Sequence, residues 1–360
     1  MDTRLTRISG LLLASAIVIT GCDSSSSSSS DTPPPANSTP VTITSTNATT
    51  IARSVLAGDS ATAYTGANPY ASKAGLPSGN QDATYQRIFD LALAYTRLAL
   101  DADSSAATSA RTVTTNTLNC DVSGTMTLSS NDTNVIGVDD AGDSFTLTFN
   151  QCADTTSVTN GSYTFTLNDK TGDPSLYPSS NWSVGVSFGM NLSSTYTFAD
   201  GSSDTTTIKG GATLTDSYDP KSTVTSGSMQ GNSIKSSWTW NSSDGSKETG
   251  TIEMANFNFA NTQNASNSSY TTDIDFTLRA SNIDGLGHNG SVTVNTNPIF
   301  RGLIDAATGN ANPPTEGTMV ITGGEGSTLT LVANSDGSTV TLTVNNEPAQ
   351  TYTWAALGGW

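Results

Sequence analysis

The residues that most often carry catalysis are scarce in this chain of 360 residues. It has a single histidine, His288, in the glycine-rich stretch Gly-Leu-Gly-His-Asn-Gly at residues 285–290. A Ser-His-Asp triad needs a histidine, and no G-x-S-x-G elbow accompanies this one. A phosphate-binding loop and a dinucleotide fingerprint are also missing from the sequence. We therefore interpret His288 as an exposed turn residue, predict no catalytic residues and no cofactor, and expect a protein that is not an enzyme.

Two groups of aspartates could bind a cation or act as a catalytic pair. Asp139, Asp140 and Asp143 are the best calcium candidates, but a twelve-residue calcium loop has acids at alternate positions and a final glutamate. Turn formation explains these three more simply. Asp273 and Asp275 would share one face of a strand, as a glycosidase pair could, but a solvated strand face is the plainer explanation. We therefore predict no metal site.

Three tryptophans could form a platform on which a sugar ring stacks, because an indole offers a large apolar surface with a polar edge. They are Trp182, Trp238 and Trp240. Each also continues an alternation of apolar residues along a strand, and this pattern favours packing in the core.

Cys22 is the residue whose chemistry the sequence indicates most directly. It follows Ile19-Thr20-Gly21, an apolar run over residues 11–19, and the basic residues Arg4 and Arg7. The order looks like a bacterial lipobox, in which the cysteine thiol takes a diacylglyceryl group, the signal peptide is cut between Gly21 and Cys22, and the freed amine receives a further acyl chain such as palmitate. An ordinary signal peptide is the alternative, but its cleavage prefers a small-x-small site. The apolar run is shorter than the roughly 20 residues that span a bilayer.

A lipid on Cys22 would anchor the chain to the inner or outer membrane of a bacterial cell envelope, and Asp23 does not decide between the two. Seven serines at residues 24–30 and three prolines at 33–35 follow. Such a composition cannot bury a core and is typical of a tether. We predict a signal peptide over residues 1–21, a lipidated tether over 22–40 and a single domain over 41–360.

The formal charge argues against nucleic acid as a partner. It is −17 for the whole chain, and residues 1–21 contribute +1 through Asp2, Arg4 and Arg7, so the processed chain carries −18. A polyanion of this kind repels phosphate backbones. Only 12% of the residues are charged, and the Ser, Thr, Asn and Gly that replace them are common in exported all-β domains.

Cys120 and Cys152 remain once Cys22 carries the lipid. Two cysteines in an oxidising compartment favour one disulfide. A zinc site or a redox pair is the alternative, but the chain has no C-x-x-C motif and His288 is far away in the sequence. We expect a disulfide that closes a loop of about 30 residues and contributes roughly 3–4 kcal/mol to stability.

Helical periodicity marks residues 41–111. Asn47 is a candidate N-cap, the apolar residues between Ala48 and Leu56 recur at i, i+3, i+4 and i+7, and Gly58 stops the run. Residues 82–100 contain neither glycine nor proline and are apolar on more than one side. We predict a second helix there, which is either buried on more than one side or packed under a curved sheet.

From about residue 112 to the end of the chain the period of the apolar residues changes to 2, which predicts strands with one apolar and one polar face. Asp-Gly turn signals between the segments favour antiparallel hairpins, and about a dozen strands would curl into a half-barrel, a barrel or a sandwich. We also expect a short strand at 41–45 and strand starts at Gly161, Gly290, Gly317, Gly326 and Gly337. The apolar members of the alternating segments are Val122, Met126 and Leu128; Phe145 to Phe149; Tyr163 to Leu167; Trp182 to Leu192; Ala212 to Tyr218; Trp238 and Trp240; Ile252 and Met254, then Phe257 and Phe259 as if across a bulge; Ile274 to Ala280; Val292 and Val294; Met319 and Ile321; Leu329 and Leu331; Val340 to Val344; Tyr352 and Trp354.

Several features together resemble a group of uncharacterised proteobacterial lipoproteins. They are the lipobox, the serine-rich tether, the helix start Asn-Ala-Thr-Thr-Ile-Ala at residues 47–52, the cysteine pair around hairpins, and the closing strands that end in Thr353-Trp354. The resemblance implies a membrane anchor and a β-rich domain, and it brings no known activity.

Two functions remain in competition. The first is a non-enzymatic structural or binding module whose partner is a protein or a glycan. The second is a periplasmic carrier of a lipid or other apolar ligand, with a cavity covered by the helix at residues 82–100. A transmembrane β-barrel is a third interpretation, but Gly358-Gly359 before Trp360, the expected disulfide and the tether disfavour it.

Overall fold

The computed structural model describes residues 38–59, 114–131, 141–154, 157–172, 178–282, 285–287, 289–305 and 311–358. Within these ranges the chain forms one sheet of 16 strands, and every pairing except that of β1 with β11 is antiparallel. The order is β16-β15-β14-β13-β11-β10-β9-β8-β7-β6-β5-β4-β3-β2, with β1 beside β11 and β12 beside β10.

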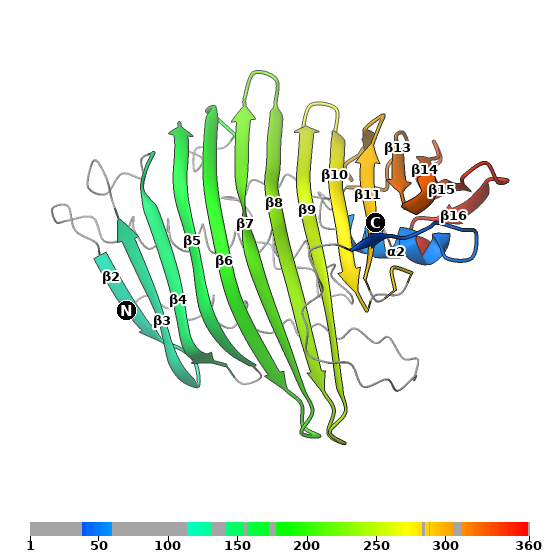
Figure 1. Ribbon diagram of the computed structural model, residues 1–360. Coiled ribbons are helices and arrows are strands. Elements are labelled where there is room, and N and C mark those ends of the chain that lie inside the picture. The colour runs from blue at the N-terminus through cyan, green and yellow to red at the C-terminus, as the bar shows by residue number, and fades with distance from the viewer. Residues whose placement is uncertain are drawn as a thin grey trace.

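The sheet is broad and twisted, and its end strands β2 and β16 do not pair with each other (Figure 1). The prediction of a mainly β, antiparallel fold is therefore confirmed, and the sheet does not close into a barrel. The strands are β1 (Thr39–Pro40), β2 (Thr114–Asn119), β3 (Ser123–Asn131), β4 (Ser144–Ala153), β5 (Ser157–Thr171), β6 (Trp182–Thr197), β7 (Ser203–Asp219), β8 (Val224–Asn241), β9 (Lys247–Asn264), β10 (Ser269–Ser281), β11 (Gly290–Thr296), β12 (Phe300–Leu303), β13 (Thr318–Thr322), β14 (Thr328–Ala333), β15 (Thr339–Val344) and β16 (Gln350–Thr353).

Alternation along the strands gives the sheet its apolar face. In β6, Trp182, Val186 and Phe188 are buried, whereas Ser183 and Ser187 between them are only half-buried. The apolar residues of neighbouring strands meet in register, so that the Phe145 and Phe165 rings stack with centroids 4.8 Å apart. Burying this face supplies the main driving force for folding.

The opposite face carries hydroxyl groups that bond in pairs across neighbouring strands. The Oγ1 atoms of Thr146 and Thr164 lie 3.0 Å apart, and those of Thr195 and Thr205 lie 2.9 Å apart. Cross-strand pairs of this kind each contribute roughly 0.2–1 kcal/mol. Threonine therefore stabilises the polar face without adding charge.

A bulge in β9 shifts the buried apolar positions from even-numbered to odd-numbered residues. Met254 and Phe257 are both buried although they are three residues apart, and Asn256 between them has a φ of 50°. The pairing with β10 shifts at the same place. The bulge predicted between these residues is confirmed.

The N-terminal segment closes the core beside the C-terminal strands. Helix α2 (Ala48–Asp59) is drawn at the C-terminal end of the sheet (Figure 1), and Ile51, Val55 and Leu56 are buried in the same apolar cluster as the sheet residues. The Arg53 Nε donates to the carbonyl of Ala356, 3.0 Å away, and so links the helix to the short helix η3 (Ala355–Leu357). The helix predicted at residues 82–100 lies outside the described residues.

Several local predictions about the N-terminal segment were wrong. The strand expected at 41–45 is formed by Thr39 and Pro40 instead. Gly58 lies inside α2 and does not end it. Asn47 does directly precede α2, as predicted for an N-cap, but its Oδ1 accepts from the backbone N–H of Thr44, 2.8 Å away, in the preceding turn.

Two predictions about strand ends were also wrong. Val122 is 61% exposed in the bend between β2 and β3 and belongs to no strand. Gly161 lies within β5, where its φ of 113° lets the chain approach the carbonyl of Asn191, and an added Cβ would lie 2.0 Å from that oxygen. Gly290 does begin a strand, as predicted.

Candidate functional site: an aromatic cluster around a buried carboxylate

The candidate site lies where four long strands turn. The turn between β6 and β7 and the turn between β8 and β9 are neighbours, because Ser203 at the start of β7 pairs with Asn241 at the end of β8. Aspartates hold both turns. Asp200 accepts from the N–H and the hydroxyl of Ser202 at 2.9 and 2.6 Å, and Asp244 accepts from the N–H of Ser246 at 2.8 Å. Rigid turns of this kind fix the ends of the strands that carry the site.

The strand register places one carboxylate between two aromatic rings. Tyr196 of β6 pairs with Asp204 of β7, which pairs with Trp240 of β8, and Trp240 pairs in turn with Glu248 of β9. Directly opposite residues in neighbouring strands have side chains on the same face. This row shares the face of Ile208, so it continues the apolar face toward the turns.

The rings extend this row into a cluster. Phe198 lies edge-to-face with Tyr196 at a centroid distance of 4.4 Å and with Trp240 at 5.1 Å. Trp238 belongs to the adjoining row, and its six-membered ring occupies the space over Gly250 that a side chain would fill. We call Tyr196, Phe198, Asp204, Trp238 and Trp240 the Asp204 cluster.

Asp204 is the unusual member of the cluster. It is 7% exposed, and its Oδ1 atom is buried with no hydrogen-bond partner. Burial raises the pKa of this carboxyl to about 6, because the surroundings disfavour the charged form. Buried polar atoms without partners are rare and costly in folded proteins, so each needs an explanation.

The four rings of the Asp204 cluster are only partly buried, in contrast to the core. Trp182, the third tryptophan considered as a sugar platform, is 2% exposed and belongs to the core. The interpretation of core packing therefore holds for Trp182 and does not hold fully for Trp238 and Trp240. The cluster combines ring surface that solvent can reach with a carboxylate beneath it.

The pair Asp273 and Asp275 forms hydrogen bonds to the neighbouring strand β11. Thr296 donates through Oγ1 to Asp273 at 2.8 Å, and Asn295 donates through Nδ2 to Asp275. Burial, followed by the charge of Asp273, raises the pKa of Asp275. Because a strand partner engages each carboxylate, the pair is explained as part of the pairing between β10 and β11.

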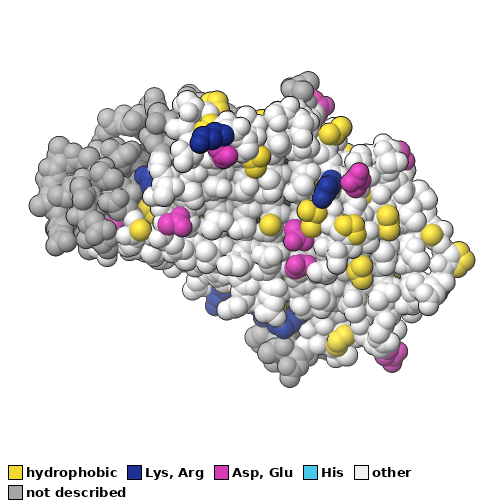
Figure 2. Space-filling view, turned by 90° about the horizontal axis from the view of Figure 1, so that it is seen from above, with side chains coloured by type: hydrophobic (Ala, Val, Ile, Leu, Met, Phe, Trp, Pro, Cys, Tyr) yellow, Lys and Arg dark blue, Asp and Glu magenta, His cyan; other side chains and the backbone are white. Residues whose placement is uncertain are grey.

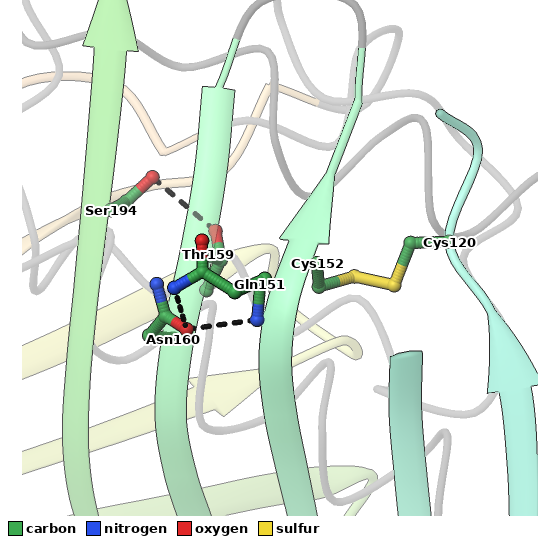
Figure 3. The surroundings of a disulfide bond; sticks show 6 residues. All are labelled: Cys120, Gln151, Cys152, Thr159, Asn160 and Ser194. Carbon is green, nitrogen blue, oxygen red and sulfur yellow. Dashed lines mark hydrogen bonds between the residues drawn. A yellow bond between two sulfur atoms is a disulfide. The ribbon is translucent and has the colours of Figure 1, made fainter. Parts of the chain in front are cut away.

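The disulfide joins Cys120, just after β2, to Cys152 in β4, with the Sγ atoms 1.91 Å apart and the Cα atoms 5.4 Å apart (Figure 3). This geometry fits the pairing expected from the sequence. Beside it, Gln151 adopts a φ of 49° at a bulge, and its N–H donates to the Oδ1 of Asn160 at 2.8 Å (Figure 3). The disulfide therefore connects the end hairpin of the sheet to the next strand.

Several of the residues considered from the sequence lie outside the described part of the chain. These are Cys22 with the cleavage site after Gly21, His288, and two of the calcium candidates, Asp139 and Asp140. The third, Asp143, is buried just before β4. Among the described residues, no group of three or more His, Cys, Asp or Glu side chains could hold a metal ion.

Asp204 itself was missed in the sequence. It lies in the run Ser203-Asp204-Thr205-Thr206-Thr207, where no apolar residue marks which positions point to the core. The only available signal was its position. Asp204 is separated by an even number of residues from Ile208, Ala212 and Leu214, so it lies on the same face of the strand as they do. A charged residue at a core-facing position of a strand is uncommon, and this signal could have identified it.

Comparison with known proteins adds no further constraint. No family model, no curated protein and no solved structure matches this chain. Among the helices of the described residues, none has the length and apolar character to cross a membrane.

Proposed function

We propose that this protein is a lipoprotein of the bacterial cell envelope, anchored by a lipid on Cys22, and that its β domain is a non-enzymatic binding module. The anchor rests on the order of the basic residues, the apolar run and Ile19-Thr20-Gly21-Cys22. The observation that carries the binding role is the Asp204 cluster, where partly exposed rings surround a carboxylate oxygen without a partner. A purely structural sheet has no use for such a group, because burying it costs stability.

The first described residues support the division into a tether and a domain. Thr39 donates its N–H to the carbonyl of Asn289 at 3.0 Å, and the carbonyl of Val41 accepts from Gly324 at 2.8 Å. Residues 39–41 are therefore hydrogen-bonded to the sheet, which supports a boundary between tether and domain close to residue 40. We propose residues 1–21 as the signal peptide, 22–40 as the lipidated tether and 41–360 as one domain.

The surface suits a protein that binds partners without strong charge. Figure 2 shows scattered single charges on a surface made mostly of uncharged polar side chains and backbone. With a formal charge of −17, the chain would be repelled by anionic polymers, so we propose a neutral partner and exclude nucleic acid.

Substitution of Cys22 tests the anchor. We expect wild-type protein to incorporate an alkyne-labelled palmitate and to sediment with the membranes, whereas Cys22→Ser protein takes up no label and leaves the membrane fraction. A matched Cys152→Ser variant should still be labelled and sediment with the membranes. If Cys22→Ser protein kept both the label and its membrane association, the lipid-anchor proposal would be wrong.

A second candidate function, carriage of a lipid or other apolar ligand, is favoured by the aromatic residues along the apolar face. Tyr163 of β5 and Phe188 of β6 stack with ring centroids 5.9 Å apart. Farther along the sheet, the ring centroids of Phe259 in β9 and Phe276 in β10 are also 5.9 Å apart. A carrier purified from cells should still contain its bound ligand. Native mass spectrometry of the purified chain would then show a lipid adduct, and a clean apoprotein mass would count against this candidate.

A further inference from the structure

We propose that the Asp204 cluster is a binding site for a neutral saccharide. The proposal rests on the binding-module function and adds the chemical class of the ligand. Four observations support it, and they concern the unpartnered carboxylate, the exposed rings, the polar groups beside them and the local charge.

The carboxylate of Asp204 is placed for a ligand and not for stability. Its two cross-strand neighbours, Tyr196 and Trp240, are aromatic, and an apolar residue at this position would pack without a desolvation cost. A hydroxyl donor would satisfy the Oδ1 atom. That atom is buried in the free protein, so a ligand reaches it after a partly exposed ring, Tyr196 or Trp240, changes its rotamer, as interface side chains commonly do on binding.

The rings supply the apolar half of a sugar site. A pyranose ring has a face of C–H groups that packs on aromatic side chains, while its hydroxyl groups point outward around the rim. Trp238 and Trp240 come from alternate positions of β8, so their side chains lie about 7 Å apart along the strand on one face. Both rings are partly exposed.

Polar groups surround the rings at neighbouring register positions. Ser194 of β6 pairs with Thr206 of β7, which pairs with Trp238, and Glu248 of β9 pairs with Trp240. The cluster is therefore bordered by two hydroxyl groups and an exposed carboxylate. Hydroxyls can both donate and accept hydrogen bonds, as the rim of a saccharide does.

The same groups disfavour two other ligand classes. An anionic ligand would meet the carboxylates of Asp204 and Glu248 and would be repelled. A quaternary ammonium ion could sit against the rings, but it has no hydrogen-bond donor and leaves the Oδ1 of Asp204 without a partner. A ligand with several hydroxyl donors satisfies this oxygen.

Titration of the full chain in detergent micelles tests the proposal. The probes are cellohexaose, maltohexaose and chitohexaose as neutral saccharides, choline as the cation and polygalacturonate as the anion, followed by calorimetry and by tryptophan fluorescence. We expect at least one neutral saccharide to bind, with Trp240→Ala lowering its affinity tenfold or more and Asp204→Asn at least threefold. Tyr352→Ala, a partly exposed aromatic on β16, should leave the affinity unchanged.

Folding controls keep the result clear. Trp240→Phe should retain most of the affinity, and circular dichroism should show the same sheet content in all variants. Binding of choline or polygalacturonate in place of the sugars would overturn the proposal, as would a folded wild-type chain that binds none of the three saccharides. In either case palmitate labelling of Cys22 would still decide the envelope anchor on its own.

Discussion

Asp204 makes the folded chain sensitive to pH in a direction opposite to that of most aspartates. Its pKa of about 6 in the folded chain lies above the ordinary value of 3.8, because burial disfavours the charge. The folded state therefore binds more protons than the unfolded state between these pH values, and the free energy of unfolding falls as the pH rises through that window. At neutral pH the full cost of the buried charge is present.

Replacing Asp204 by Asn should accordingly raise stability at pH 7.5 by an amount on the order of 1–3 kcal/mol, and the gain should disappear near pH 3.5. Urea unfolding of the two proteins at both pH values measures this difference. An equal gain at both values would mean that the carboxyl is not the titrating group.

Asp336 should behave in the reverse way. The hydroxyl of Thr339 and the N–H groups of Ser338 and Thr339 donate to it in the turn before β15, and they lower its pKa to about 2. Because the folded pKa lies below the unfolded one, the stabilisation is present above about pH 4 and is lost as the pH falls toward 2. Asp336→Asn should therefore lower the urea midpoint at pH 7.5 and have little effect near pH 2, and a uniform loss at both would contradict the assignment.

At the scale of single elements, the packing of β8 against β9 includes the ring of Trp238, which lies over Gly250. A Cβ on Gly250 would lie 2.0 Å from the Cζ2 atom of Trp238, so the two cannot coexist. Gly189 in the middle of β6 is a matched control, since the nearest atom to an added Cβ there is 4.0 Å away.

Gly250→Ala should displace the Trp238 ring, change the near-ultraviolet circular dichroism and cost about 1–3 kcal/mol, as overpacking usually does. Gly189→Ala should leave the spectrum unchanged and alter stability by less than about 1 kcal/mol. Matching spectra for the two variants would show that the ring does not lie over Gly250.

The alternation of apolar residues made most strands predictable, because burial on one face is a property of each strand alone. The bulge between Met254 and Phe257 was predictable for the same reason, since the change of parity is visible in the apolar residues. Gly161 was misjudged because its role depends on how closely the carbonyl of Asn191 on the next strand approaches. That distance is a property of the pairing and leaves no mark in the local sequence.

In the candidate site, too, some residues could be recognised from the local sequence and others could not. Trp238 and Trp240 stood out from their type and spacing, but their partial exposure depends on their place near the ends of the strands. Asp204 joins them only through the register that aligns β6, β7 and β8. Register is set by turns and bulges along whole strands, so a run of serine and threonine around the aspartate gave no clue to its neighbours.

For the whole molecule, an open sheet raises the question of how its ends are kept in place. Among the described strands, β6 to β9 are the longest, with 16 to 18 residues each, and are paired along both sides. Strand β2 has six residues and a partner on one side only. Exposed edge strands fray and can pair with other chains. The disulfide lies at this end of the sheet, where Cys120 follows β2 directly.

The disulfide should therefore protect one end of the molecule more than its centre. Hydrogen exchange followed by mass spectrometry should show the slowest exchange in β6 to β9, and reduction of the disulfide should speed exchange in β2 and β3 while leaving β8 and β9 unchanged. The expected loss of global stability, roughly 3–4 kcal/mol for a loop of about 30 residues, applies only to the cooperative unit that contains the loop. Equal acceleration in β2 and β9 would show that the sheet unfolds as a single unit and that the link acts on all of it.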